Sequence, residues 1–183
     1  MVYIDIKKVI RKQDLMNMKT LILYTTITGA TEKYVNWLKN GIEKCAIQNI
    51  ENQPEIDFEN FERVIFALPT YSGQINKKEI LENKWEQIKS KLVYLVVIGG
   101  VPQESSWSQK SYNSIKKEVR DGLKGYVKII GLAQDVDKKM NKVEHFLAKL
   151  FLGIDPDKID KRKEVFEEDL KAVWEMLNYK VNK

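Results

Sequence analysis

Three threonines lie close together where an apolar run gives way to a helical pattern, in Leu23-Tyr-Thr-Thr-Ile-Thr-Gly-Ala-Thr-Glu32. Thr26, Thr28 and Thr31 offer hydroxyl groups, and the backbone through Gly29 offers N–H groups at the start of the expected helix. A helix N-terminus has unpaired donors and a partial positive charge, so it can hold an anion without lysine or arginine. Glycine permits a close approach of the backbone. This segment predicts a phosphate-binding loop, and the alternative is that the threonines only cap the helix.

Two common phosphate-binding motifs are absent from this segment. It has no G-x-x-x-x-G-K-[ST], since Lys33 follows Glu32, and it has no G-x-G-x-x-G. Binding of nucleoside triphosphates or of dinucleotides in the Rossmann manner therefore loses its main support. His145 has no Cys, His or carboxylate at metal-ligand spacing, so we expect no metal site, and no residue stands out as a general acid or base.

Four apolar runs must position this loop and its neighbours. They are rich in residues that favour strands, and three of them lead through a turn into a helical pattern. The expected strands cover residues 19–25, 63–68, 92–98 and 126–132, and the helical patterns after the first three cover residues 34–45, 76–90 and 108–122. Continuous apolar runs are typical of a parallel sheet with helices on both faces.

The remaining elements complete an α/β fold. A polar strand is expected near residues 46–50, at an edge of the sheet, and two more helices near residues 138–152 and 163–179. A doubly wound sheet needs only one helix after its last strand, so residues 138–152 count as an extra helix before the C-terminal one. The predicted domain covers residues 18–183, after a basic N-terminal extension at residues 1–17.

At this point the sequence resembles the flavodoxin family. Ile22-Leu-Tyr-Thr-Thr-Ile-Thr-Gly-Ala-Thr31 is similar to its phosphate-loop signature, a hydrophobic pair and an aromatic followed by T/S-x-T-G-x-T. Ala30 stands where asparagine is common, and Val35 where the signature prefers alanine. The resemblance implies a three-layer, doubly wound, five-stranded parallel sheet of order 2-1-3-4-5, with the ligand at the carboxyl ends of the strands.

The resemblance also implies FMN as the cofactor and names its contacts. The phosphate would be held by the first loop, and the isoalloxazine ring would lie between the loop at residues 69–74 and the loop at residues 99–107. The residues carried over are Thr26, Ile27, Thr28, Gly29, Ala30, Thr31, Pro69, Thr70, Tyr71, Ser72, Gly73, Gly99, Gly100 and Trp107.

Three of these residues have particular expected roles. Tyr71 and Trp107 are the candidates for stacking on the ring. The alternative is that each is an ordinary loop aromatic. Gly73 tolerates both signs of φ, so its backbone suits a flip beside flavin N5.

A second resemblance, in arrangement more than identity, is to the flavodoxin-type, menaquinone-dependent protoporphyrinogen oxidases. It covers residues 59–73 and the order of late strand, extra helix, basic stretch at residues 160–164 and final helix. The basic residues of that family's second and third loops are missing here. Residues 138–152 carry phenylalanine and leucine flanked by lysine. They either pack onto the sheet as an ordinary helix or contact a quinone, a partner protein or the inner membrane surface.

Charge and composition restrict the partners. The 183 residues carry a formal net charge of +5, and residues 1–20 hold five bases against two acids. Since the excess is concentrated in the extension, we expect no nucleic-acid partner. The single Cys45 and the charged N-terminus favour a cytoplasmic protein, with peripheral contact to the inner membrane surface as an alternative.

The sequence predicts an FMN-binding electron-transfer protein that serves a redox partner protein or a quinone. An FMN-dependent oxidoreductase acting on a quinone or porphyrinogen-like substrate is one alternative. A scaffold of the same fold without flavin is another, since fold does not fix function. The loops near the proposed ring carry Lys77, Lys78 and Lys110 against Glu32, Glu79 and Glu104, without the acidic surroundings of low-potential flavodoxins.

Overall fold

The computed structural model describes residues 17–52, 55–131 and 164–178. Most of the predicted extension at residues 1–17 and all of the predicted helix at residues 138–152 lie outside these ranges. The elements, in chain order, are β1 (Thr20–Tyr24), α2 (Ala30–Gly41), β2 (Cys45–Asn49), β3 (Arg63–Tyr71), β4 (Gln74–Ile75), α3 (Lys78–Ile88), β5 (Leu92–Gly99), α4 (Ser106–Asn113), α5 (Lys117–Gly122), β6 (Gly125–Ile130), the 3-10 helix η2 (Glu167–Leu170) and α7 (Lys171–Met176).

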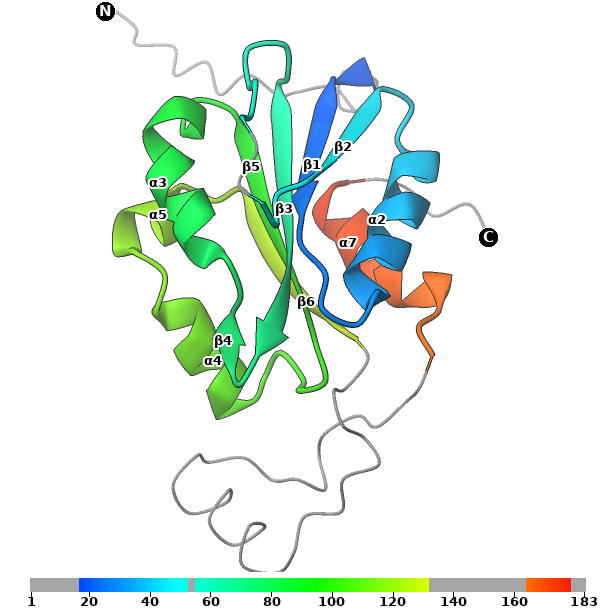
Figure 1. The fold of residues 1–183 in the computed structure, drawn as a ribbon, viewed down its shortest axis with the longest axis vertical. Helices are drawn as coiled ribbons and strands as arrows, with labels where there is room; N and C mark the ends of the chain where they lie inside the picture. Colours follow the sequence, from blue (N-terminus) through cyan, green and yellow to red (C-terminus); the bar gives the residue numbers. More distant parts are fainter. Residues whose placement is uncertain (1–16, 53–54, 132–163, 179–183) are drawn as a thin grey trace, which may run out of the picture.

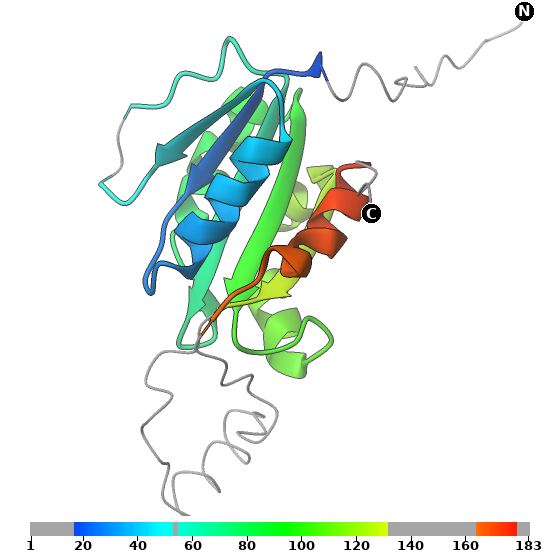
Figure 2. The same ribbon diagram turned by 90° about the vertical axis from the view of Figure 1, so that its right-hand side faces the viewer.

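The sheet has the predicted order. Strands β2-β1-β3-β5-β6 pair in parallel, and the short β4 lies off this path, antiparallel to β3. The register is regular, with Ile22 beside Ile65 and Ile65 beside Tyr94. Helices α3, α4 and α5 cover one face, and α2 and α7 cover the other (Figures 1 and 2). The α/β, three-layer prediction is confirmed, with β2 as the polar edge strand. The helical pattern predicted up to Cys45 is wrong at its end, because α2 ends at Gly41 and Cys45 begins β2.

Two apolar clusters, one on each face, hold the sheet in place. The strands alternate their side chains between the faces, so neighbouring residues such as Ile22 and Leu23 belong to different clusters. All of β1 and residues 63–69 of β3 are buried. Because each cluster packs against helices, the central strands read as unbroken apolar runs in the sequence.

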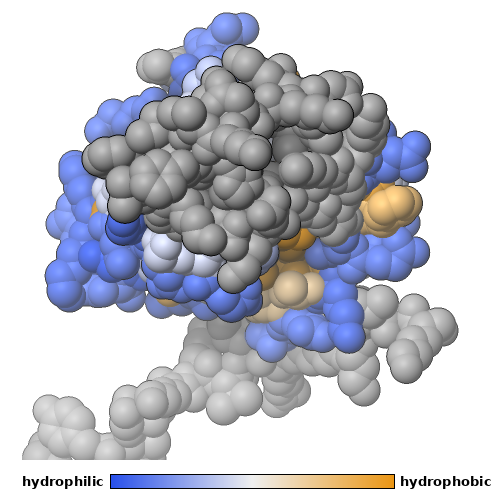
Figure 3. All heavy atoms as spheres, turned by 90° about the horizontal axis from the view of Figure 1, so that it is seen from below, coloured by the Kyte–Doolittle hydropathy of each residue, from blue (hydrophilic) through white to orange (hydrophobic). Residues whose placement is uncertain are grey.

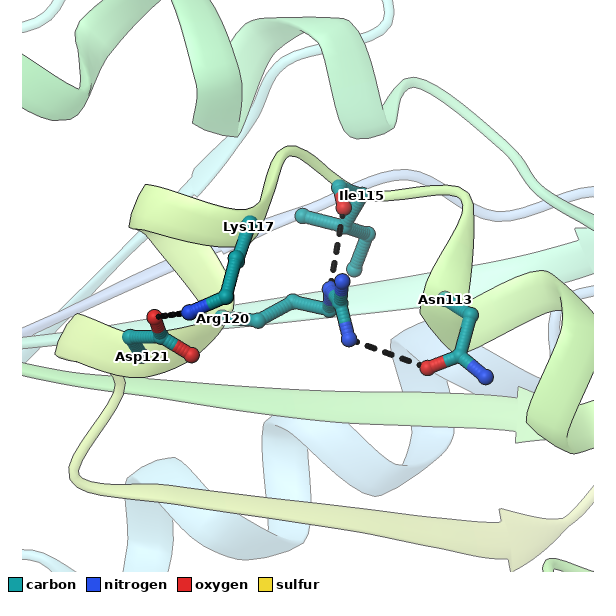
Figure 4. A network of polar contacts seen from close by, with 5 residues as sticks. All are labelled: Asn113, Ile115, Lys117, Arg120 and Asp121. Atoms are coloured by element: carbon teal, nitrogen blue, oxygen red, sulfur yellow. Dashed lines mark hydrogen bonds and ion pairs between the residues drawn. The ribbon is translucent and has the colours of Figure 1, made fainter.

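The predicted single helix at residues 108–122 is wrong: the chain forms α4 and α5 with a break between them. Arg120 of α5 reaches back across the break, where its Nε donates to the carbonyl of Ile115 at 3.0 Å and its Nη1 to Asn113 Oδ1 at 3.0 Å (Figure 4). A carbonyl freed from a helix needs a donor. Arg120 supplies it, so the break costs little.

Helix α3 stabilises the same break from the other side. Lys78 Nζ donates to the carbonyl and the hydroxyl of Ser114 at 2.7 Å each. The backbone N–H of Lys116, where α5 begins, donates to Glu82 Oε1 at 2.8 Å. These partners are more than 30 residues away in the sequence, so local periodicity could not reveal them.

The C-terminal helix is shorter than the predicted 163–179. It begins with the 3-10 turn η2 and continues as α7. Asp169 Oδ2 accepts from the backbone N–H of Phe166 at 3.0 Å, which fixes the start of the turn.

Tyr34 joins α2 to this C-terminal segment. Its ring is buried, and its hydroxyl lies 2.6 Å from the carbonyl of Ile130 and 2.6 Å from Asp169 Oδ2. We expect Tyr34→Phe to lower the free energy of unfolding by about 1–3 kcal/mol, because it removes the donor from a buried acceptor. Urea denaturation would measure this. Tyr71→Phe, at an exposed ring, is the control, and equal losses in the two variants would contradict the prediction.

Candidate functional site

The predicted site residues meet at one end of the sheet. Parallel pairing brings the carboxyl ends of β1, β3 and β5 to the same edge, at the lower end of Figure 1. The threonine loop follows β1, a hairpin follows β3, and the loop from Gly99 to Ser105 follows β5. Residues more than 70 positions apart in the sequence therefore lie around one region.

The threonine loop is not explained by helix capping. Helix α2 begins at Ala30 with Gly29 as its N-cap residue, and no side chain caps it. Thr26 Oγ1 instead accepts from the N–H of Gly29 at 3.0 Å, within the loop. Gly29 has a φ of +83°, a conformation in which glycine is preferred. The loop thus ends in an uncapped helix N-terminus, where donors are available for a ligand.

The space in front of this loop is open. A Cβ built on Gly29 would meet no described atom within 4 Å. Thr28 is exposed, Thr26 is half-buried, and Thr31 is buried in the first turn of α2. A group of the size of a phosphate can therefore approach the backbone at Gly29 without displacing a described side chain.

Thr25, which no sequence argument singled out, stands at the start of the loop. Its side chain is fully buried, and its hydroxyl has no hydrogen-bond partner among the described residues. Buried hydroxyls are nearly always paired with protein or water. The only feature of the sequence that could have pointed to Thr25 is its position next to Thr26.

Glu32, in the first turn of α2, turns toward the sheet. The hydroxyl of Tyr24 donates to Glu32 Oε1 at 3.5 Å. Burial, together with the nearby Glu32 carboxylate, raises the pKa of Tyr24. This contact gives the Glu32 carboxylate a partner on β1 close to the helix N-terminus.

The predicted loop at residues 69–74 is wrong in detail, because these residues form a β-hairpin. Strand β3 continues to Tyr71, which pairs with Gln74 of β4. The turn between them consists of Ser72, with a φ of +46°, and Gly73, with a φ of +76°. Two successive positive φ angles are typical of a type I′ turn, which matches the twist of a hairpin. The Tyr71 side chain is 56% exposed beside this turn.

Trp107 packs against the hairpin. A Cβ built on Gly73 would lie 2.3 Å from Trp107 Cζ3, closer than any real contact, so the indole lies directly on the glycine. Trp107 belongs to the first turn of α4. The structure thus brings together the predicted pair Tyr71 and Trp107 and places the indole against the turn. Stacking of either ring on a ligand stays a prediction.

The second and third loops also touch at their first residues. A Cβ built on Gly99 would lie 2.0 Å from Thr70 Oγ1 and 3.4 Å from Lys128 Cε. Thr70 Oγ1 also donates to the carbonyl of Ile98 at 3.4 Å. Pro69 is buried, and its carbonyl accepts from Asn76 N at 2.9 Å. Gly99 thus allows the side chains of β3 and β6 to pass beneath the loop.

The lysines near the hairpin are held by other groups. Lys77 Nζ lies 3.8 Å from Glu51 Oε1, and Lys78 is bound to Ser114. Where described residues are visible at this end of the molecule, the surface is mostly hydrophilic, with small apolar patches (Figure 3). Ile27 and Tyr71 are among the exposed large hydrophobic residues.

Two kinds of feature are not found in the part of the chain that the structure describes. It has no helix that is both long and apolar enough to cross a membrane. In residues 17–52, 55–131 and 164–178 there is also no group of three or more His, Cys, Asp or Glu residues that could hold a metal ion.

Comparisons with known proteins were made for both sequence and structure. A family model described as a flavodoxin domain matches residues 21–150. A search of curated proteins found no significant match. The structure is similar to a flavoprotein in complex with FMN from Lactobacillus acidophilus NCFM, with 18% identity and a TM-score of 0.45, over 66% of this chain and 95% of that one. It is also similar to the Trp repressor binding protein from Bacillus subtilis, with 16% identity and a TM-score of 0.44, over 62% of this chain and 87% of that one.

Proposed function

The chain belongs to the flavodoxin domain family, and on this premise we propose that the loops at the carboxyl end of its sheet bind FMN and that the protein transfers electrons. The observation that carries the proposal is the threonine loop. It ends in an uncapped helix N-terminus with open space in front of Gly29. Those features fit a phosphate monoester, which needs several donors and no side-chain cation.

Different groups of the threonine loop would bind the phosphate and keep the loop in shape. The N–H groups in the first turn of α2 have no side-chain cap, and such groups point outward along a helix axis. The hydroxyls of Thr26 and Thr28 are accessible there, while Thr31 is buried within the first turn. Because Thr26 holds the N–H of Gly29 at 3.0 Å, the loop keeps its shape before the ligand arrives, which lowers the ordering cost of binding.

The hairpin and the loop after β5 would hold the ring. Tyr71 presents an exposed aromatic surface, and the Trp107 indole packs directly against Gly73 of the turn. Aromatic side chains exclude water from a flat ligand and contribute about 0.5–1.5 kcal/mol per stacked pair beyond area burial. When bound, FMN supplies the redox chemistry, so the protein itself needs to provide only binding and electrostatics.

Electron transfer is the finer part of the proposal. The hairpin with its exposed Tyr71 offers a route for electrons at the surface. We infer a redox partner protein that docks near this end of the sheet. We also propose a cytoplasmic location, with a quinone as the alternative acceptor.

The test is an absorption spectrum of the purified full-length protein, followed by titration with FMN and stepwise reduction. We expect a flavin spectrum, or stoichiometric uptake of added FMN, and rapid reoxidation by a one-electron acceptor. Protein that is colourless and takes up no FMN would overturn the proposal. Multiple turnovers of a quinone without a partner protein would instead favour an enzyme over a carrier.

A further inference from the structure

Lys128 is the only charged residue in β6, Gly125-Tyr-Val-Lys-Ile-Ile130. Its neighbours Val127 and Ile129 face the cluster under α2 and α7, so Lys128 faces α4 on the other side of the sheet. Its Nζ donates to Ser108 Oγ at 2.6 Å. A lysine inside an otherwise apolar strand is costly to bury. The proposed FMN contacts do not include this residue, so they do not account for a lysine at this position.

The hydrogen bonds of Lys128 hold the loop between β5 and α4. Ser108 Oγ, which accepts from Lys128, donates in turn to the carbonyl of Pro102 at 2.7 Å. The backbone N–H of Lys128 donates to Gln103 Oε1 at 2.6 Å. Ser105 Oγ lies 3.0 Å from Ser108 Oγ and accepts from the N–H of Ser108 at 3.1 Å. Residues 102 and 105 are thus linked to the Lys128 side chain through Ser108, and residue 103 is linked to the Lys128 backbone.

The same side chain passes beneath the place where the two ring-binding loops meet. Lys128 Cε lies 3.4 Å from a Cβ built on Gly99, and Thr70 Oγ1 lies 2.0 Å from that point. Gly99 begins the third loop, and Thr70 precedes Tyr71 of the hairpin. A positive charge on Lys128 is therefore close to both loops.

No described acidic group compensates this charge. Burial lowers the pKa of Lys128 to about 8, and burial is the one cause of that shift. Glu104 of the loop and Lys110 of α4 are exposed, and the facing part of β5, residues 95–99, has no charged side chain. Near pH 7 the half-buried ammonium is thus held by the Ser108 hydroxyl, and its field reaches the loops with less screening than that of a fully exposed lysine.

We propose, on the basis of the FMN site above, that Lys128 is a positioning residue for the loop from Gly99 to Ser105 and that its charge favours the reduced, anionic form of the bound ring. The hydrogen bonds fix the loop against the sheet. The charge then attracts the negative charge that the ring gains on reduction, and this raises the affinity for reduced FMN relative to oxidised FMN.

Three variants separate the charge from the contacts. In Lys128→Met the charge is lost, and we expect the ratio of reduced to oxidised FMN affinity to fall about tenfold, the effect of one unit charge on another about 12 Å away at an effective dielectric of 20. Lys128→Arg keeps the charge and should restore most of the ratio. Lys124→Met removes an exposed lysine just before β6, at the end of the strand away from the loops, and should leave the ratio unchanged.

Stability against pH gives a readout that needs no flavin. The folded pKa of about 8 lies below the ordinary lysine value of about 10.4. Between these values the unfolded chain binds more protons, so the stability of the wild type rises with pH. Lys128→Met should lack this rise and should be at least as stable as the wild type at pH 7. If Lys128 served only to stabilise the fold, Lys128→Met would instead be less stable than the wild type at pH 7.

The deciding experiment measures oxidised FMN affinity and the midpoint potential of wild type, Lys128→Met, Lys128→Arg and Lys124→Met, with thermal unfolding of each apoprotein from pH 7 to pH 10. A lowered potential in Lys128→Met, recovered in Lys128→Arg, supports the proposal. Equal potentials in all four proteins, or equal losses in both Lys128 variants, overturn it. If Lys128→Met does not fold, Lys128→Gln replaces it under the same criteria. If the wild-type protein binds no oxidised FMN, the proposed function itself is overturned. The measurement of oxidised FMN affinity shows this separately from the effect of Lys128.

Discussion

Replacing Thr28 by glutamate is expected to abolish FMN binding and leave the fold intact. Thr28 is exposed, immediately before Gly29 at the uncapped start of α2, so a longer side chain fits there without repacking. A phosphate monoester carries about −1.5 to −2 charges at pH 7. A carboxylate within a few ångströms opposes it by several kcal/mol, so the dissociation constant should rise on the order of a hundredfold or more. Quenching of flavin fluorescence on titration measures this.

Two matched controls separate charge from shape. Thr28→Gln has the same size without the charge, and we expect a much smaller loss of affinity. Riboflavin has no phosphate, so Thr28→Glu should bind it as well as the wild type does. Wild-type affinity of Thr28→Glu for FMN would show that the phosphate lies elsewhere.

Replacing Gly73 by alanine is expected to give the largest loss of stability near the site. At its φ of +76° an L-residue costs about 1–2 kcal/mol more than glycine. The new Cβ would also lie 2.3 Å from Trp107 Cζ3, so the indole must move, and overpacking of this kind costs about 1–3 kcal/mol. Urea denaturation should therefore show a loss of about 2–5 kcal/mol. FMN affinity should fall as well, because Trp107 supports the turn.

The neighbouring residue provides the control for this prediction. Ser72 also has a positive φ, +46°, so Ser72→Gly should be neutral or slightly stabilising. In the background of Trp107→Ala, Gly73→Ala should lose only the backbone part of its cost. The same loss with and without the indole would contradict the contact as the cause.

The sheet was predictable because its signal is local. Strands β1, β3 and β5 are buried on both faces, so each appears as an unbroken apolar run, such as Leu92 to Gly99. The threonine loop was equally visible, because its residues are consecutive and directly precede α2. The order of the strands in the sheet was predicted from the resemblance to the flavodoxin family, since the apolar runs alone do not fix which strands are neighbours.

The rest depends on contacts between distant residues. The break between α4 and α5 relies on Lys78 and Glu82 of α3, and the hairpin relies on Trp107, 34 positions after Gly73. Lys128 would have been visible as a lone charge in an apolar strand, but its partners Gln103 and Ser108 belong to a different element. Propensity and periodicity carry no information about such pairs.

Gln103 also affects how the protein meets other chains. Strand β6 is the last in the order β2-β1-β3-β5-β6, and free N–H groups at such an edge can template the addition of a foreign strand. The side chain of Gln103 occupies one of these groups, at Lys128, with a 2.6 Å bond. A strand adding there must first pull away the loop that is proposed to hold the ring. We therefore expect cofactor loading to protect this edge against self-association, so that apoprotein aggregates more readily than flavin-bound protein.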